Sequence, residues 1–139
     1  EALARAGVPV GVLTGPIVPG LTDHELPSIV SAAVDAGAQF AGKTILRLPY
    51  GVKDLFEEWL ARYFPERKEK VLNRVRSIRG GKLNDPEFGS RMRGEGIFAE
   101  HISALFRMAC KKTGIHGRSP ELSTDAFRPP EGPQLTLFG

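Results

Sequence analysis

The sequence is poor in cysteine: Cys110 is the only one among its 139 residues. A single cysteine excludes an internal disulfide, and it excludes an iron–sulfur cluster or a cysteine-rich zinc site built by this chain alone. The scarcity of cysteine also fits a reducing compartment, so we expect a cytoplasmic protein. No apolar run in the sequence is long enough to span a membrane, so we expect no membrane partner.

Three histidines are present, but they show none of the spacings that bind metals. His24, His101 and His116 lie far apart in the sequence. No Ser-His-Asp or Cys-His arrangement can be argued from the order of the residues, and the sequence has neither a phosphate loop of the Walker type nor GxGxxG. The residue pattern by itself therefore assigns no reaction to the chain.

Two apolar runs joined by a helical pattern indicate a βαβ unit. Residues 8–13 (VPVGVL) and residues 39–48 (QFAGKTILRL) predict buried parallel strands. Residues 14–21 (TGPIVPGL) are too rich in Pro and Gly to continue the first strand, so we expect a loop there. In such units the loops that follow the strands carry the sites, and here these loops are residues 14–21 and 49–53.

The helix between the two strands has two candidate starts. Thr22 and Glu25 have the spacing of a capping box, whereas Pro27, in or near the first turn, leaves Asp23 as an alternative cap. Both starts remain open from the sequence. Gly37 stands where this helix is expected to end.

Three further helices are predicted, over residues 52–64, 66–79 and 98–113, the last of them closed by Gly114. Their apolar stripes are Leu55, Trp59 and Leu60; Val71, Leu72, Val75 and Ile78; and Ile102, Leu105, Phe106 and Ala109. We expect the first of these helices to pack on the sheet as the outer layer of a βα repeat. Trp59 is then expected in the core, not as a stacking platform.

Positive charge is concentrated in one segment of the chain. Residues 66–112 carry a net charge of +6, whereas residues 1–65 carry −2 and residues 113–139 carry −1. The basic segment either faces nucleic acid or is an ordinary solvated helix face.

A loop with paired arginines is a candidate phosphate site within the basic segment. Residues 82–96 contain three glycines and an Asp-Pro pair, which predict a loop. Arg91 and Arg93 lie two residues apart in it, and both can reach outward. The pair either binds phosphate or a substrate, or it belongs to an ordinary surface loop.

Six stretches carry a resemblance to a known family. They are residues 7–12 (GVPVGV), 16–23 (PIVPGLTD), 45–49 (ILRLP), 53–56 (KDLF), 79–82 (RGGK) and 88–94 (FGSRMRG). In this order and spacing they resemble the C-terminal part of radical S-adenosylmethionine (SAM) proteins of the spore photoproduct lyase-like group, whose members are described as DNA repair photolyases. The resemblance covers about residues 1–113.

The resemblance implies an α/β fold, with this chain as the end of a partial (β/α)6 radical-SAM barrel. Residues 1–65 would supply its last βα units, residues 66–113 a basic helical extension, and residues 114–139 a flexible tail. Residues 1–7 (EALARAG) read as the end of a helix with its terminal glycine. We therefore expect the chain to be the C-terminal piece of something longer.

The resemblance also implies that the whole protein carries a [4Fe–4S] cluster that cleaves SAM to a 5′-deoxyadenosyl radical. The family's CxxxCxxC motif is missing from this chain, so we expect no cluster and no catalysis from it alone. In the family, the loop after the fifth strand lies against SAM, and Pro16, Ile17, Pro19 and Gly20 match that loop as cofactor-binding residues. Asp23 would either hydrogen-bond there or cap the helix.

Arg47 is a further candidate for the same pocket. By the two-residue period, Lys43, Ile45 and Arg47 share one face of the second strand. Arg47 is near the carboxyl end of this strand, where barrel sites open. It either pairs with a cofactor carboxylate or a substrate phosphate, or it forms a salt bridge to a neighbouring helix.

The end of the chain resembles a protein-binding peptide. Residues 134–138 (QLTLF) match the Gln-Leu-x-Leu-Phe pattern of peptides that bind the bacterial sliding clamp. Leu137 and Phe138 would fill an apolar pocket, and Gln134 would supply the polar contacts that fix the register. The alternative is that Leu135, Leu137 and Phe138 fold back on the domain or have no role.

Two functions are consistent with these observations. One is the C-terminal segment of a radical SAM iron–sulfur enzyme, lyase- or repair-like, that acts on nucleic acid. The other is a non-catalytic binding module with a basic helical surface and a clamp-binding tail. Reductive cleavage of SAM by the full-length protein separates the two.

Overall fold

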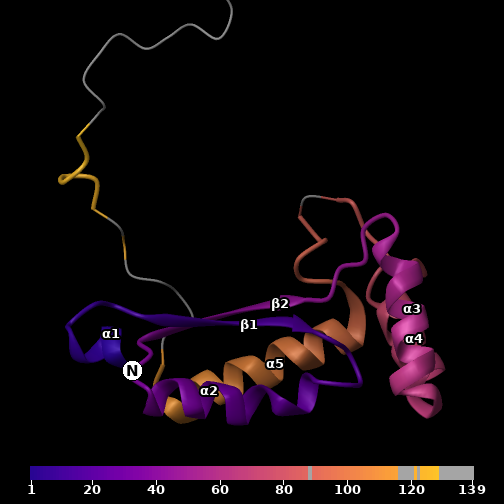
Figure 1. The fold of residues 1–139 in the computed structure, drawn as a ribbon, viewed down its shortest axis with the longest axis horizontal. Coiled ribbons are helices and arrows are strands. Elements are labelled where there is room, and N and C mark those ends of the chain that lie inside the picture. Colours follow the sequence, from indigo (N-terminus) through magenta and orange to yellow (C-terminus); the bar gives the residue numbers. More distant parts are fainter. Residues whose placement is uncertain (88, 116–120, 122, 129–139) are drawn as a thin grey trace, which may run out of the picture.

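The computed structural model describes residues 1–87, 89–115, 121 and 123–128. In chain order the elements are α1 (Ala2–Arg5), β1 (Gly11–Ile17), the 3₁₀ turn η1 (Asp23–Glu25), α2 (Leu26–Asp35), β2 (Phe40–Ile45), α3 (Val52–Tyr63), the 3₁₀ turn η2 (Pro65–Arg67), α4 (Lys68–Ser77) and α5 (Gly96–Thr113). Figure 1 shows α2 and α5 on one side of the strands, and α3 with α4 beyond one end of them. The described part is thus a mixed α/β fold with an open sheet of two strands.

The two strands pair in parallel, as the βαβ pattern predicts. The register aligns Gly11 with Phe40, and it shifts between Thr14 and Ile17. The prediction that the first strand ends before the Pro- and Gly-rich segment is wrong, because β1 continues to Ile17. Pro16 lies in the stretch where the register shifts, so its missing N–H removes no bond from the regular ladder.

The helix α2 begins without the side-chain cap that the sequence predicts. Thr22 Oγ1 accepts a hydrogen bond from the backbone N–H of Val18, at 3.0 Å, and makes no cap bond to the helix. Asp23 lies inside η1 and does not cap α2 either. The predicted end is confirmed, since Gly37 follows the last turn with a φ of +95°.

One face of the sheet is covered by α2 and α5, and a hydrophobic core lies between these layers (Figure 1). Its buried residues include Ile17, Leu26, Val30, Ala41, Ile45, Ile102, Phe106 and Ala109. Alternation along β1 turns Gly11, Leu13 and Gly15 to the opposite face, where Leu13 is 68% exposed. Within the described residues the sheet therefore has one covered face and one open face.

A second hydrophobic core lies beyond the carboxyl ends of the strands. It is formed by Val18, Leu21, Leu46, Leu48, Leu60, Val71, Leu72 and Val75. Leu46 and Leu48 thus belong to a loop, because β2 ends at Ile45, earlier than predicted. The prediction that residues 52–64 pack on the sheet is also wrong, since α3 packs against α4 and contributes to this second core.

The apolar stripe of α3 is only partly buried. Leu60 is fully buried, but Leu55 is 67% exposed and Trp59 is 39% exposed, which corrects the expectation of a core tryptophan. The Trp59 ring stacks on Phe56 with ring centres 5.7 Å apart. The physical reason is that α3 packs against one helix, α4, and not against the sheet. A single helix buries a narrower stripe of the α3 surface than a sheet would bury.

Candidate functional site

The loop between α4 and α5 is fastened to the carboxyl end of β2 by a buried arginine. Nη2 of Arg79 donates to the carbonyl oxygen of Leu46 at 2.8 Å, and its Nη1 donates to the carbonyl oxygen of Ser90 at 3.1 Å. The backbone N–H of Ile45 also donates to the carbonyl oxygen of Met92, at 3.3 Å. These bonds bring the loop that carries the predicted phosphate site to the edge where the parallel strands end.

Two guanidinium groups and one carboxylate influence one another at this edge. Arg79 is 4% exposed, and this burial is the main cause that lowers the pKa of its guanidinium group. The carboxylate of Asp85 raises this pKa, and the positive charge of Arg47 lowers it further. Asp85 accepts hydrogen bonds from the Ser90 hydroxyl and from the Glu87 N–H, and these bonds lower the pKa of Asp85. Two guanidinium groups therefore share one ionised carboxylate.

Arg47 lies just past the end of β2 and is half-buried. Its Nη1 lies 3.8 Å from the Sδ of Met92, while its Nε is buried and has no hydrogen-bond partner in the described part of the chain. No ion pair between Arg47 and a neighbouring helix is present among the described residues. A guanidinium group with an unused donor is suited to a carboxylate or a phosphate.

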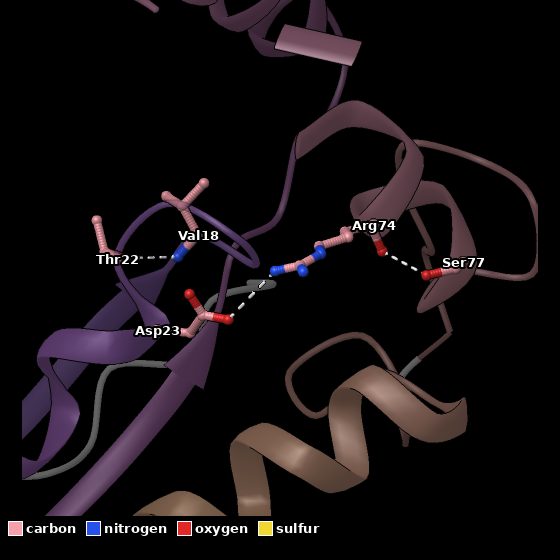
Figure 2. A network of polar contacts seen from close by, with 5 residues as sticks. All are labelled: Val18, Thr22, Asp23, Arg74 and Ser77. Atoms are coloured by element: carbon pink, nitrogen blue, oxygen red, sulfur yellow. Dashed lines mark hydrogen bonds and ion pairs between the residues drawn. The ribbon is translucent and has the colours of Figure 1, made fainter. Parts of the chain in front are cut away.

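Figure 2 shows how the loop after β1 is joined to α4. The Thr22–Val18 hydrogen bond closes the loop, and Asp23 forms an ion pair with Arg74 at 3.7 Å. Gly20 has a φ of +83°, and a Cβ atom at this position would lie 2.8 Å from Cδ of Arg74. Glycine is favoured here by the backbone conformation, and a larger residue would also displace the Arg74 side chain.

A small apolar hollow opens beside this junction. Arg74 lies over the ring of Phe98, 5.1 Å from its centre, in a cation–π contact. The hollow has a volume of about 300 Å³, and its lining includes Pro19, Asp23, Phe98 and His101. Apolar walls with a few polar groups are the usual setting for a small ligand.

The four loop residues predicted to bind SAM lie in different surroundings. Pro16 is exposed, and Ile17 is buried in the core beneath the sheet. Pro19 is buried at the hollow beside α5, and Gly20 packs against Arg74. The structure therefore brings Pro19 and Gly20 together and turns the side chain of Ile17 toward the sheet core.

The two arginines predicted to bind phosphate differ in exposure. Arg93 is exposed, and with Arg107 it lines a second hollow at the start of α5. Arg91 is half-buried, and its backbone N–H donates to the carbonyl oxygen of Glu87 at 3.0 Å, which fixes the turn.

Sequence reasoning missed the role of Arg79. A signal for it exists, because Arg79 follows Leu72 by seven residues and Val75 by four, a spacing that continues the buried face of α4 just past its last residue, Ser77. A charged residue on a buried face must have polar partners. Its acceptors, the carbonyl oxygens of Leu46 and Ser90, leave no pattern in the sequence.

The cysteine and the acidic residues do not form a metal centre in the described residues. Among them, no group of three or more His, Cys, Asp or Glu side chains is placed to hold a metal ion. Cys110 is buried in α5, and burial raises the pKa of its thiol. A single buried cysteine does not fit the [4Fe–4S] cluster that the resemblance implies.

Comparisons of this chain with protein-family models, with curated proteins and with solved structures found no match. Over the ranges that the structure describes, the helices lack the length and the apolar character needed to cross a bilayer. The predicted clamp-binding residues Gln134, Leu135, Leu137 and Phe138 lie outside the described residues. A functional assignment thus depends on the sequence resemblance and on the geometry of the strand ends.

Proposed function

We propose that this chain is the C-terminal segment of a radical SAM iron–sulfur enzyme, lyase- or repair-like, that acts on nucleic acid. The observation that supports this most is a parallel βαβ unit with helices on one face and a second, open face. It occupies the part of the chain where the resemblance expects the last strands of a partial barrel. In such a barrel the open face looks inward, and further βα units continue the sheet.

The surroundings of Arg47 suit the carboxylate of SAM. Its guanidinium group has no carboxylate partner among the described residues, and its Nη1 lies against only the weak acceptor Sδ of Met92, so an added carboxylate would gain a charge-assisted hydrogen bond without breaking an ion pair. Bound SAM would supply a 5′-deoxyadenosyl radical, formed together with methionine when the reduced cluster donates one electron, and this radical would take a hydrogen atom from the substrate. The cluster needed for this chemistry would be held by cysteines elsewhere in the whole protein.

The test uses the whole protein to which this chain belongs, purified without oxygen and reconstituted with iron and sulfide. With dithionite we expect reductive cleavage of SAM, measured as 5′-deoxyadenosine. Arg47→Met should raise the KM for SAM about tenfold or more, because a charged hydrogen bond contributes about 1.5–3 kcal/mol. Arg62→Met, on the exposed side of α3, is the matched control and should leave this KM unchanged. Absence of both cluster absorbance and 5′-deoxyadenosine would contradict the proposal.

The sequence at the end of the chain supports a second candidate function. Residues 134–138 match the clamp-binding pattern at every specified position, and residues 66–112 carry a net charge of +6. A non-catalytic module that holds nucleic acid and the sliding clamp would need only these two features. This candidate is favoured if the protein binds both partners but cleaves no SAM.

A further inference from the structure

Three basic side chains from three separate elements gather on the helix-covered side of the sheet. Lys43 comes from β2, Arg93 from the loop between α4 and α5, and Arg107 from α5. Partial burial lowers the pKa of Lys43, and the nearby charges of Arg107 and Arg93 lower it further. The hydrogen bond between Ile45 and Met92 accounts for the position of Arg93, because it holds this part of the loop beside β2.

None of these three basic side chains forms an ion pair with a carboxylate in the described part of the chain. In the part of the chain that the structure describes, no Asp or Glu oxygen lies within 4.0 Å of the charged nitrogens of Lys43, Arg93 or Arg107. Arg62 and Arg74, by contrast, each have a carboxylate partner. We therefore define Lys43, Arg93 and Arg107 as the basic cluster.

An open hollow of about 600 Å³ gives a ligand access to Arg93 and Arg107, two of the three members of the basic cluster. Arg93 and Arg107 line it together with Ser103, whose hydroxyl can donate a hydrogen bond. Glu95 and Glu100 line it as well, so the two lining arginines are balanced by two carboxylates. Lys43 adds a third positive charge near the two arginines and makes the region net positive. Because the three charges come from separate elements, a ligand with several separated negative charges suits the basic cluster better than a compact anion.

We propose that the basic cluster binds the phosphate groups of a nucleic-acid strand. The inference rests on the proposed function, and it adds the surface on which the strand backbone lies. Like charges held together repel one another, and phosphates between them relieve the repulsion. Guanidinium groups match the geometry of phosphate oxygens, and the cluster supplies two of them.

The experiment measures binding of a fluorescein-labelled single-stranded oligonucleotide to the whole chain by fluorescence anisotropy, over a range of salt concentrations. The triple variant Lys43→Gln, Arg93→Gln, Arg107→Gln should lose about tenfold or more in affinity at low salt. The slope of log K against log salt should become shallower by about 0.7 for each phosphate that the variant no longer neutralises. Circular dichroism verifies that the variant is folded.

A second triple variant provides the matched control. Arg67→Gln, Lys68→Gln and Lys70→Gln remove the same net charge from η2 and the start of α4, and should retain most of the affinity and the slope. Equal losses in the two variants would mean that binding reports only net charge, and would overturn the proposal. Full displacement of the strand by inorganic phosphate, at an ionic strength matched with chloride, would assign the cluster to free phosphate instead and would also overturn it.

Lys43→Met supplies a readout that does not depend on net charge alone. Removal of the repelling ammonium group should raise the unfolding midpoint of the chain while it weakens strand binding. An unchanged midpoint with unchanged binding contradicts the proposal. The assay for 5′-deoxyadenosine keeps the two proposals apart. If the whole protein cleaves no SAM but nucleic-acid binding still depends on the basic cluster, the proposed enzyme function is wrong and the proposed binding site stands.

Discussion

At the scale of single residues, Arg79 connects the chemistry of the strand ends to the fold. Its planar guanidinium group offers donors in two directions, so it can serve the carbonyl oxygens of Leu46 and Ser90 at the same time. A lysine could not span the same acceptors with one ammonium group. Arg79 is thus a positioning residue, because it holds the loop that carries Met92 and Arg93 against β2.

Arg79→Met is expected to lower the free energy of unfolding by about 1–3 kcal/mol, because the carbonyl oxygens of Leu46 and Ser90 would lose their buried donor. Methionine keeps most of the apolar volume, so the loss would report the hydrogen bonds. Urea unfolding measures the change. Hydrogen exchange at the Ile45 N–H, which donates to Met92, should become faster as the loop loosens.

Arg76→Met is the control for this substitution. Arg76 lies in the last turn of α4, three residues before Arg79; its side chain is partly exposed and donates only to the side chain of Asn73 among the described residues. Its replacement should change stability by no more than about 0.5 kcal/mol. Similar losses in both variants would show that Arg79 acts through its charge and not through its acceptors.

At the scale of elements, α3 shows how one helix can be held by very little buried surface. Leu60 is its one fully buried side chain, and α4 is its principal neighbour in the described residues. Leu55 faces outward at 67% exposure, while Trp59 is 39% exposed and stacks on Phe56. The stability of α3 should therefore depend on Leu60 far more than on its other apolar residues.

Leu60→Ala is expected to cost about 2–5 kcal/mol of unfolding free energy, through lost burial and the cavity left in the second core. Leu55→Ala is the matched control, because it makes the same change five residues earlier on the same helix. Leu55 is 67% exposed, so this variant should stay within about 0.5 kcal/mol of the parent protein. Equal losses in urea unfolding would contradict the orientation of α3.

The helices were predictable from the sequence because their signals are local. The stripe from Val71 to Ile78 and the glycine after Thr113 define α4 and α5 without knowledge of the rest of the fold. The end of β1 was not predictable, because Pro16 normally interrupts a strand. The burial of Trp59 was not predictable either. Periodicity shows which residues share a face of a helix, but not how much of that face the neighbouring element covers.

The candidate site was predictable only in part, for a related reason. Arg47 and Arg93 are visible from the sequence, because one follows a strand and the other lies in a glycine-containing loop. The meeting of Lys43, Arg93 and Arg107 depends on how three distant segments pack, and no spacing in the sequence records it. Long-range convergence is therefore the part of the site that only the structure supplies.

At the scale of the whole molecule, the two proposed surfaces meet at Met92. The Sδ of Met92 lies against Arg47, where the SAM carboxylate is proposed, and the next residue, Arg93, belongs to the basic cluster. A nucleic-acid strand bound at the basic cluster would therefore lie near the carboxyl edge of the sheet. An enzyme that acts on nucleic acid needs this proximity, because contacts to the strand backbone must hold the reacting position close to the cofactor.

The tail would connect this molecule to replicated or repaired DNA. We expect the peptide of residues 133–139 to bind the bacterial sliding clamp with a Kd on the order of micromolar, because Leu137 and Phe138 supply apolar anchors while ordering a short peptide opposes binding. Titration calorimetry with the clamp measures this affinity for the peptide and for the whole chain. The double variant Leu137→Ala, Phe138→Ala should abolish binding in both, whereas Thr136→Ala, at the unspecified position of the pattern, should leave it nearly unchanged. Equal signals from the parent peptide and the double variant would exclude clamp recognition by these residues.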